Sequence, residues 1–315
     1  MSRILVTGGA GFIGASVVKA LAARGDEVIA FDIADSARLA AMARTHPNIE
    51  FIQGEITEWP HVVGLIKGRK PDAIIHCAAI VGVTNSLASP IGTFRVNVDG
   101  SLNLFEAMRL FGVRRVVNLS SEETYGIFEA DKISENHPNR PLKPYGISKY
   151  AVERLACDYQ SAYGLEIVHV RTCWVYGPGL PRPRAPKIFV DAAVSGRTLH
   201  LPEGGDYRVD HVYIDDCVDG IVKALDKPSH RFDTYHIATG NAPSLSEIVD
   251  IVKGLEPKAD LSIGPGPYRF FDGTEAVRKG ALDITRARAE LGYEPRFPIK
   301  EGLAAYMESA RAGLG

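Results

Sequence analysis

The hydrophobic residues of this chain follow two alternating patterns from residue 2 to about residue 172. Short β-branched apolar runs alternate with longer stretches whose apolar residues recur at helical spacing. The runs predict six strands, at residues 4–6, 28–31, 49–53, 73–76, 116–119 and 167–170. Continuous apolar strands separated by helices indicate a parallel sheet that is covered on both faces. We therefore predict an α/β fold with a doubly wound parallel Rossmann sheet.

This alternation breaks after Arg171. Residues 175–208 are rich in proline, glycine and arginine. Four prolines exclude regular helix until about Lys187, namely Pro178, Pro181, Pro183 and Pro186. Helical patterns return over residues 244–255 and from residue 283 onward.

The change of pattern predicts two domains. Residues 1–172 form the Rossmann domain, to which some later strands at about 209–240 return, and residues 173–315 form a smaller, mixed domain. Ligands of doubly wound folds bind beyond the carboxyl ends of the strands. We expect the second domain to close over this edge and to bind the substrate.

Composition and charge limit the classes of partner. The chain has 315 residues, 45% of them hydrophobic, and a net charge of −2 without a long basic run, which argues against nucleic-acid binding. It begins almost directly on an apolar strand, with no basic leader and no apolar run of about 18 residues, so we expect a cytoplasmic protein without a membrane partner. The four cysteines lack metal-ligand spacing, so we expect no metal site.

A glycine-rich turn joins the first predicted strand to the first predicted helix. Without Cβ atoms its backbone can approach a pyrophosphate, and the helix start offers free N–H groups and a positive dipole end. The residues assigned to this site are Gly8, Gly11, Phe12, Ile13 and Gly14.

Asp32 stands at the end of the second predicted strand, 18 residues after Gly14. A carboxylate there can accept hydrogen bonds from both ribose hydroxyls and repels a 2′-phosphate, which favours NAD over NADP. A glycine turn without a ligand, and an aspartate that only caps a turn before Ser36, are the structural alternatives.

Further residues are suitably placed to line a dinucleotide. Glu55 and Ile56 follow the third strand, and Ala78 and Ala79 follow the fourth. We assign them to the adenine wall and to backbone contacts, although small alanines can equally serve close helix–sheet packing. Asn97 lies in the following helix pattern, where a buried amide needs several partners. We expect it to brace the sheet and Lys149 through water.

Tyr145 and Lys149 are the strongest indication of catalysis. A free tyrosine titrates near pH ~10 and is a poor base at neutrality unless a fixed positive charge stabilises the phenolate. The i, i+4 spacing puts both side chains on one face of a helix, where the ammonium can sit beside the phenol and reach a cofactor ribose. Ser121 can hydrogen-bond the same substrate hydroxyl. These three residues predict redox chemistry.

The motifs occur in a familiar order. They are the glycine turn, His76-Cys77-Ala78-Ala79, Asn97-Val98-Asp99-Gly100, Ser120-Ser121 followed by Tyr125-Gly126, Tyr145 through Lys149, and Val175-Tyr176-Gly177-Pro178. With this set the chain resembles the extended short-chain dehydrogenase/reductase superfamily, and more narrowly the NAD-dependent nucleotide-sugar epimerases and dehydratases. The resemblance covers nearly the whole chain.

This resemblance implies a bound NAD that takes hydride from a sugar carbon. Tyr145, helped by Lys149, takes the hydroxyl proton while Ser121 holds the oxygen. The ketone can then receive hydride on its other face, which is epimerisation. It can also lose a proton and a leaving group, which is dehydration.

Glu122 and Glu123 bear on the second path. The 4,6-dehydratases carry Thr-Asp-Glu where this chain has Ser121-Glu122-Glu123, and their two acids serve as general acid and base. Neighbouring residues of a strand point to opposite faces, so at most one reaches the sugar. We assign Glu123 as catalytic and Glu122 as substrate-binding. A solvated or arginine-paired acidic turn is the alternative.

The substrate half departs from the family pattern. Trp174 occupies the position where nucleotide-sugar enzymes commonly carry a substrate-facing asparagine, and Arg208 lies one residue before the usual arginine position. Arg208 and Lys187, with Arg182 and Arg184, can build an anion pocket, or can be solvated loop residues. Thr84 is a further polar candidate that can equally cap a turn.

These observations favour a nucleotide-sugar epimerase of the 4-epimerase type. The alternatives are a 4,6-dehydratase, a net NAD-dependent dehydrogenase of a sugar or sugar acid, and a cofactor-binding regulatory protein without catalysis. The helical stretches at 98–111 and 145–163 carry apolar residues on more than one face, which predicts a homodimer.

Overall fold

The centre of the fold is a seven-stranded sheet. A computed structural model describes residues 2–270 and 272–313 of the chain. The order of strands across the sheet is β11-β7-β5-β4-β1-β2-β3. Their bounds are β1 (Arg3–Thr7), β2 (Glu27–Asp32), β3 (Ile49–Gln53), β4 (Ala73–His76), β5 (Arg115–Ser121), β7 (Glu166–Thr172) and β11 (Thr234–Ile237). β1 pairs with β2 and β4, β2 with β3, and β4 with β5, all in parallel. The six predicted strands and the α/β class are confirmed.

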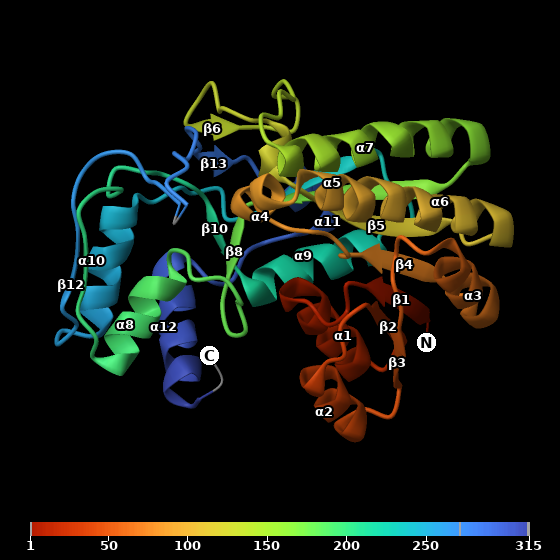
Figure 1. Cartoon of the computed structure of the whole chain (residues 1–315), viewed down its shortest axis with the longest axis horizontal. Helices are drawn as coiled ribbons and strands as arrows, with labels where there is room; N and C mark the ends of the chain where they lie inside the picture. Colours follow the sequence, from red (N-terminus) through yellow and green to blue (C-terminus); the bar gives the residue numbers. More distant parts are fainter. Residues whose placement is uncertain (1, 271, 314–315) are drawn as a thin grey trace. The chain divides into compact units, whose positions relative to one another are not determined.

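Helices cover both faces of this sheet, as Figure 1 shows. Those on one face lie together in the figure: α3 (Trp59–Arg69), α4 (Val83–Ala88), α5 (Pro90–Phe94), α6 (Gly100–Phe111) and α7 (Pro144–Tyr163). A π-helical turn, η1 (Arg95–Asp99), joins α5 to α6, and a 3₁₀ turn, η2 (Glu122–Thr124), follows β5.

The opposite face carries α1 (Phe12–Arg24), α2 (Ala37–Thr45) and the end of α9 (Ile214–Asp226). An ion pair of 2.5 Å between Arg24 and Asp226 joins the ends of α1 and α9.

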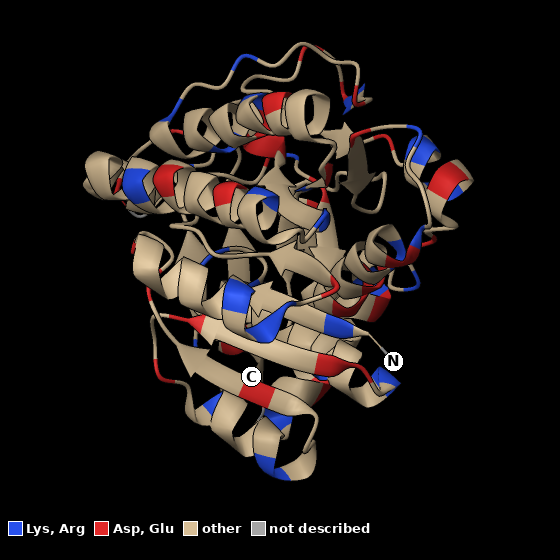
Figure 2. Ribbon diagram, turned by 90° about the vertical axis from the view of Figure 1, so that its right-hand side faces the viewer, with Lys and Arg blue, Asp and Glu red and all other residues tan. Residues whose placement is uncertain are grey.

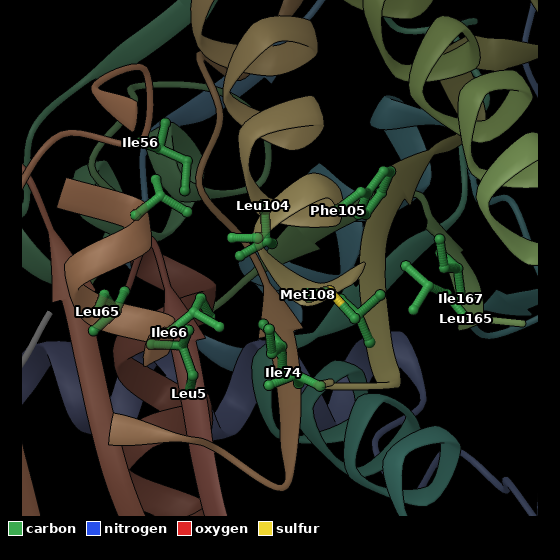
Figure 3. Close-up of a cluster of buried hydrophobic side chains, with 14 of the residues drawn as sticks. Leu5, Ile56, Leu65, Ile66, Ile74, Leu104, Phe105, Met108, Leu165 and Ile167 are labelled. Atoms are coloured by element: carbon green, nitrogen blue, oxygen red, sulfur yellow. The ribbon is translucent and has the colours of Figure 1, made fainter. Parts of the chain in front are cut away.

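The hydrophobic core of this part lies between the sheet and the helices α3, α6 and α7 (Figure 3). Its buried side chains include Leu5 and Ile74 from the strands and Leu104, Phe105 and Met108 from α6. Their burial supplies the hydrophobic free energy that holds these helices on the sheet. The carboxyl ends of β1, β2, β4 and β5 are thereby brought to one edge, because all four strands run in parallel.

The described residues divide into two compact units. The first contains residues 2–126, 138–171 and 218–235, and the second contains the remainder. The predicted boundary at residue 172 falls beside the end of one first-unit segment. The structure differs at residues 127–137, which belong to the second unit because β6 (Lys132–Ile133) pairs with β13 (Ala281–Leu282). The roles of the two parts stay a prediction.

The second unit consists of short strands and helices. Besides β6 and β13 they include β8 (Trp174–Tyr176), α8 (Lys187–Ser195), β9 (Leu199–Leu201), β10 (His211–Tyr213), α10 (Leu245–Leu255), β12 (Leu261–Ile263), α11 (Thr285–Leu291) and α12 (Ile299–Arg311). The helix expected near Lys187 and the one expected over 244–255 are both present. α10 begins with a capping box between Ser244 and Glu247.

Two strands lie in the region 209–240 that was expected to return to the sheet. β11 does form an edge of the seven-stranded sheet, whereas β10 pairs in parallel with β8 in a separate two-stranded sheet. Tyr213 of β10 packs edge-on against Tyr176 of β8, with ring centroids 5.6 Å apart, and both rings are buried. Aromatic packing with β8 therefore accounts for the place of β10.

Acidic and basic residues are interspersed along the helices and strands in view in Figure 2. Within residues 2–270 and 272–313, no helix has the length and apolar character needed to cross a bilayer.

Candidate active site

The glycine turn is built so closely that side chains are excluded at two positions. Gly8 has φ +69°, and a Cβ there would come within 2.6 Å of the backbone nitrogen of Ala78. A Cβ on Gly14 would overlap the carbonyl oxygen of Gly8. The turn therefore brings the start of α1 against the end of β4, with only backbone at the closest approach.

The start of α1 is suited to an anion. Gly11 is its N-cap residue, and among the described residues no side chain caps the helix. The backbone N–H groups of Phe12, Ile13 and Gly14 belong to the first turn, where intrahelical acceptors are lacking. Such a helix end attracts negative charge. The cradle therefore fits a dinucleotide pyrophosphate.

Asp32 lies beside this turn. Its carboxylate accepts hydrogen bonds from the N–H of Ala10 at 2.9 Å and from the N–H of Ala34 at 3.0 Å. Ser36, not Asp32, caps α2, since its hydroxyl accepts from the N–H of Leu39 at 3.3 Å. A carboxylate has further lone pairs, so the predicted ribose contacts remain compatible with these bonds.

The residues after β3 and β4 contribute in different ways. The side chain of Ile56 is buried in the core, where it abuts Gly100 of α6, so any contact with an adenine would come from its backbone. Glu55 is half-buried and accepts a hydrogen bond from Thr57 at 2.7 Å. Ala78 lies directly against Gly8, and Ala79 follows it half-buried. Ala78 is therefore closely packed and also lies at the edge where we expect the cofactor.

Asn97 makes more direct contacts than the sequence suggested. Its side chain accepts from the N–H of Ile80 at 2.7 Å and donates to the carbonyl of Ile80 at 3.1 Å. It also donates to the hydroxyl of Ser148 at 2.9 Å, and Ser148 donates to the carbonyl of Tyr145 at 2.8 Å. Asn97 therefore braces the loop after β4 against the first turn of α7 directly, where a bridging water was expected.

A buried hydrogen-bond chain behind this loop was missed by the sequence analysis. Thr7, the last residue of β1, lies 2.6 Å from Nδ1 of His76, and Nε2 of His76 lies 2.9 Å from the hydroxyl of Ser101. The Ser101 hydroxyl donates to the carbonyl of Asn97 at 2.5 Å, so it accepts the proton of Nε2. Nδ1 then accepts from Thr7. Burial, with a smaller effect of Lys149, lowers the pKa of His76 to about 3.

α7 packs on η2 next to Tyr145 and Ser121. Gly146, the residue after Tyr145, has no room for a Cβ, because the backbone oxygen of Glu123 occupies that space. Ser121 precedes η2 and accepts a hydrogen bond from the N–H of Glu123 at 3.2 Å. Tyr145 and Ser121 are both buried.

Lys149 follows Tyr145 by one helical turn, and its side chain is 6% exposed. Its ammonium donates to the carbonyl of Leu119 in β5 at 2.7 Å. Burial lowers its pKa from 10.5 to about 8, and the nearby Cys77 and Glu153 act in the opposite direction. A positive charge is thus held on the same face of α7 as Tyr145.

The two glutamates differ in burial. Glu122 is only 1% exposed, whereas Glu123 is partly accessible. A solvated acidic turn therefore does not describe Glu122, whose carboxyl group lies within the protein. Thr84 is half-buried in α4, in the same unit.

The other predicted substrate residues lie in the second unit. Trp174 is buried in an aromatic cluster, with centroids 5.7 Å from Tyr207 and 5.8 Å from Tyr268. Lys187 forms an ion pair with Asp191 at 3.0 Å, and the exposed Arg208 forms one with Glu247, also at 3.0 Å. Each of these charges is already paired with a carboxylate.

Arg184 contributes a further cation to the aromatic cluster. Its guanidinium lies over the ring of Trp174, 4.9 Å from the centroid. Within the described ranges, no group of three or more His, Cys, Asp or Glu residues is arranged to hold a metal ion.

Residues 4–238 match the family model described as the NAD dependent epimerase/dehydratase family. The chain belongs to this family. A UDP-glucose 4-epimerase of Mycolicibacterium smegmatis is 35% identical to it, over 98% of each chain. A dTDP-glucose 4,6-dehydratase of Xanthomonas campestris is 28% identical, over 96% of this chain and 92% of the relative.

Among solved structures, that of the Thermotoga maritima UDP-glucose 4-epimerase with UDP-glucose has a TM-score of 0.88 to this chain. It is 31% identical and covers 99% of this chain and 100% of that one. Membership of the NAD-dependent epimerase/dehydratase family confirms the predicted enzyme class, its cofactor NAD and the extended short-chain dehydrogenase/reductase resemblance.

Proposed function

We propose that this protein is a nucleotide-sugar 4-epimerase in which Tyr145 is the general base. The observation that carries the proposal is the packing of Gly146, the neighbour of Tyr145, on the turn that follows Ser121, with buried Lys149 one helical turn after Tyr145. The UDP-glucose 4-epimerases among the similar proteins support the same reaction for this chain.

The chain's own groups have distinct tasks in this mechanism. The hydroxyl of Ser121 holds the sugar hydroxyl by a hydrogen bond, and Tyr145 removes its proton. The Lys149 ammonium stabilises the phenolate electrostatically, an effect that burial strengthens because the local dielectric is low. Asn97 and Ser148 keep the first turn of α7 in register with the loop after β4.

The cofactor would be held by the glycine turn, the first turn of α1 and Asp32. When bound, NAD supplies the reversible hydride transfer at the sugar carbon. The Asp32 carboxylate would select a free ribose 2′-hydroxyl over a phosphate.

A product analysis tests the function. The purified protein is incubated with UDP-glucose, dTDP-glucose and UDP-glucuronic acid, and the product is analysed by mass and by NMR. Epimerisation leaves the mass unchanged and inverts one carbon. Stoichiometric accumulation of NADH absorbance would instead identify a net dehydrogenase, and unchanged substrates in every case would contradict catalysis on nucleotide sugars.

Dehydration is the second candidate, favoured specifically by the buried Glu122 beside Glu123. Two adjacent carboxyl groups can supply the general acid and the general base that dehydration requires. The expected signature is a product lighter by one water, lost in Glu123→Gln. A product of unchanged mass argues for epimerisation.

The assembly and location follow as proposals of their own. We propose a homodimer formed by helices α4 to α7, whose surface exposes Ile91, Phe94, Leu110, Ile147 and Tyr163. Exposed apolar residues on neighbouring helices are typical of such interfaces. A cytoplasmic location stays a prediction, and fractionation of the native cells would test it.

A further inference from the structure

Glu153 and Arg171 form a buried ion pair in the first unit. Arg171, in β7, donates from Nε to Glu153 Oε1 at 2.9 Å and from Nη2 to Oε2 at 2.5 Å. The two side chains are 5% and 6% exposed. Taking both charges out of water is costly, so such a pair is retained only where further hydrogen bonds or a function compensate.

Its further hydrogen bonds all lead to the segment that carries Ser121. The hydroxyl of Ser120 donates to Glu153 Oε1 at 2.5 Å. Arg171 Nη1 donates to the phenol oxygen of Tyr125 at 2.7 Å, and its guanidinium lies 4.6 Å from the centroid of that ring. The pair therefore touches both ends of the stretch from Ser120 to Tyr125.

Asn139 extends the same network to the middle of that stretch. Arg171 Nη2 donates to its Oδ1 at 3.4 Å, and its Nδ2 donates to Thr124 Oγ1 at 3.2 Å. Thr124 in turn donates to the carbonyl of Ser121 at 3.0 Å. The backbone of Ser121 is thus tied to Arg171 through two polar side chains.

Glu153 also acts on the charge of Lys149, whose pKa it raises together with Cys77. Glu153 is one helical turn after Lys149 on α7, so the two lie on the same face. The other titratable groups near Lys149 are Tyr145 on α7, His76 and Cys77 at the end of β4, and His169 on β7.

Both of these histidines are held neutral. Burial lowers the pKa of His76 to about 3, and burial likewise lowers the pKa of His169. Cys77 and Glu153 are the charged neighbours that raise the pKa of Lys149 against the effect of burial. Burial by itself would raise the pKa of Glu153, and its hydrogen bonds and ion pair with Arg171 hold that pKa below its usual value, so Arg171 keeps the carboxylate ionised.

We propose that Glu153 and Arg171 are a positioning pair, which fixes the Ser120–Tyr125 segment and sets the electrostatic field in which Lys149 acts. We assign neither side chain a contact with the substrate or the cofactor. The inference rests on the proposed function, because it takes the charged Lys149 as the partner of Tyr145.

Two single variants are expected to move the pH profile in the same direction, because each removes the negative charge of Glu153. Activity that needs the Lys149 ammonium falls as pH rises through the pKa of that group. Glu153→Gln leaves Arg171 as an uncompensated cation, so the alkaline limb of kcat moves to lower pH by about 1 unit. Arg171→Met lets the buried Glu153 take up a proton, so the limb again moves to lower pH, by up to about 1 unit. The double variant shifts the limb no further than Glu153→Gln does.

A purely structural role would lower Tm without moving the alkaline limb. Both single variants lower Tm, on the order of 10 °C, because each leaves a buried polar group without its partner. The matched control is Asp216→Asn in the second unit, a buried carboxylate that accepts from the N–H groups of Arg296 and Phe297 at 2.9 Å each. It lowers Tm and leaves the alkaline limb in place.

A readout without turnover separates this inference from the proposed function. In protein labelled with ¹³C-lysine, the Lys149 resonance is assigned by its loss in Lys149→Met and titrated in the wild type and both variants. A lower midpoint in both variants supports the pair's role even if no nucleotide sugar is converted. An unchanged or higher midpoint in either variant overturns it even if Lys149→Met abolishes epimerisation.

Discussion

The ammonium of Lys149 donates a hydrogen bond to the carbonyl oxygen of Leu119, 2.7 Å away in β5. This bond ties the middle of α7 to the strand that ends at Ser121, because Leu119 lies two residues before that serine. α7 and β5 are therefore fixed to each other beside the predicted catalytic residues. The proposed mechanism depends on this alignment.

Tyr145→Phe is expected to lower kcat for epimerisation by about 10²–10⁴-fold with little change in KM, because general-base catalysis is lost while the ring still fills its place. Steady-state kinetics with UDP-glucose measure it. Tyr150→Phe is the matched control, since i+5 neighbours do not share a helix face. Equal activity of Tyr145→Phe and the wild type would rule out the assignment.

Gly14→Ala is expected to reduce NAD affinity by about tenfold or more, a loss of about 1.4 kcal/mol or more. The new Cβ would overlap the Gly8 carbonyl and shift the turn. Gly64→Ala in α3 is the control, where no neighbour lies within 4 Å. There the change should raise the free energy of unfolding by about 0.5–1 kcal/mol. Calorimetric NAD titration and urea unfolding report the two effects, and unaltered NAD binding by Gly14→Ala would contradict the site.

His76 should make the stability of the protein fall in acid. Its pKa in the folded protein is about 3, against an ordinary 6.5, so the folded state keeps it neutral while the unfolded state binds a proton. Stability is fully present above pH 6.5 and declines as pH falls toward 3, with a slope of at most about 1.4 kcal/mol per pH unit.

His76→Asn removes this proton, so the difference in unfolding free energy between wild type and variant should shrink from pH 7 to pH 5. Urea unfolding at several pH values measures it. His200→Asn, at a half-exposed side chain, serves as the comparison. A difference independent of pH would show that His76 is not held neutral.

Trp174→Ala is expected to cost about 3–5 kcal/mol of stability, because the ring is buried among Tyr207, Tyr268 and Arg184. Trp59→Ala, at a partly exposed ring on α3, should cost clearly less. Chemical denaturation followed by circular dichroism compares them. If both variants lose the same stability, Trp174 is not a packing residue of the second unit.

The helix surface from α4 to α7 should control assembly. Ile91 is 73% exposed on α5 and Leu110 is 49% exposed on α6, and an aspartate at both positions would place charges in the proposed interface. The double variant should run as a monomer in size-exclusion chromatography with light scattering. Ile33→Asp, 61% exposed after β2, should leave the dimer intact, and a monomeric wild type would refute the interface.

Several local features of the structure and the site could be predicted from the sequence. The strand periods, the glycine turn before α1, Asp32 at the end of β2 and the four-residue step from Tyr145 to Lys149 all depend on neighbours along the chain. For the same reason the start of α8 near Lys187 followed from the prolines before it. These features could therefore be predicted without knowledge of distant contacts.

Other features depend on residues far apart in sequence, and only the tertiary structure decided them. The pairing of Glu153 with Arg171, the chain from Thr7 through His76 to Ser101, and the pairing of β6 with β13 have no signature in local periodicity. Polar residues at the ends of buried strands indicated that hydrogen-bond partners exist, since buried polar groups need such partners. Which partners these are depends on strand order, which brings distant segments together and is not encoded in the spacing of any one segment.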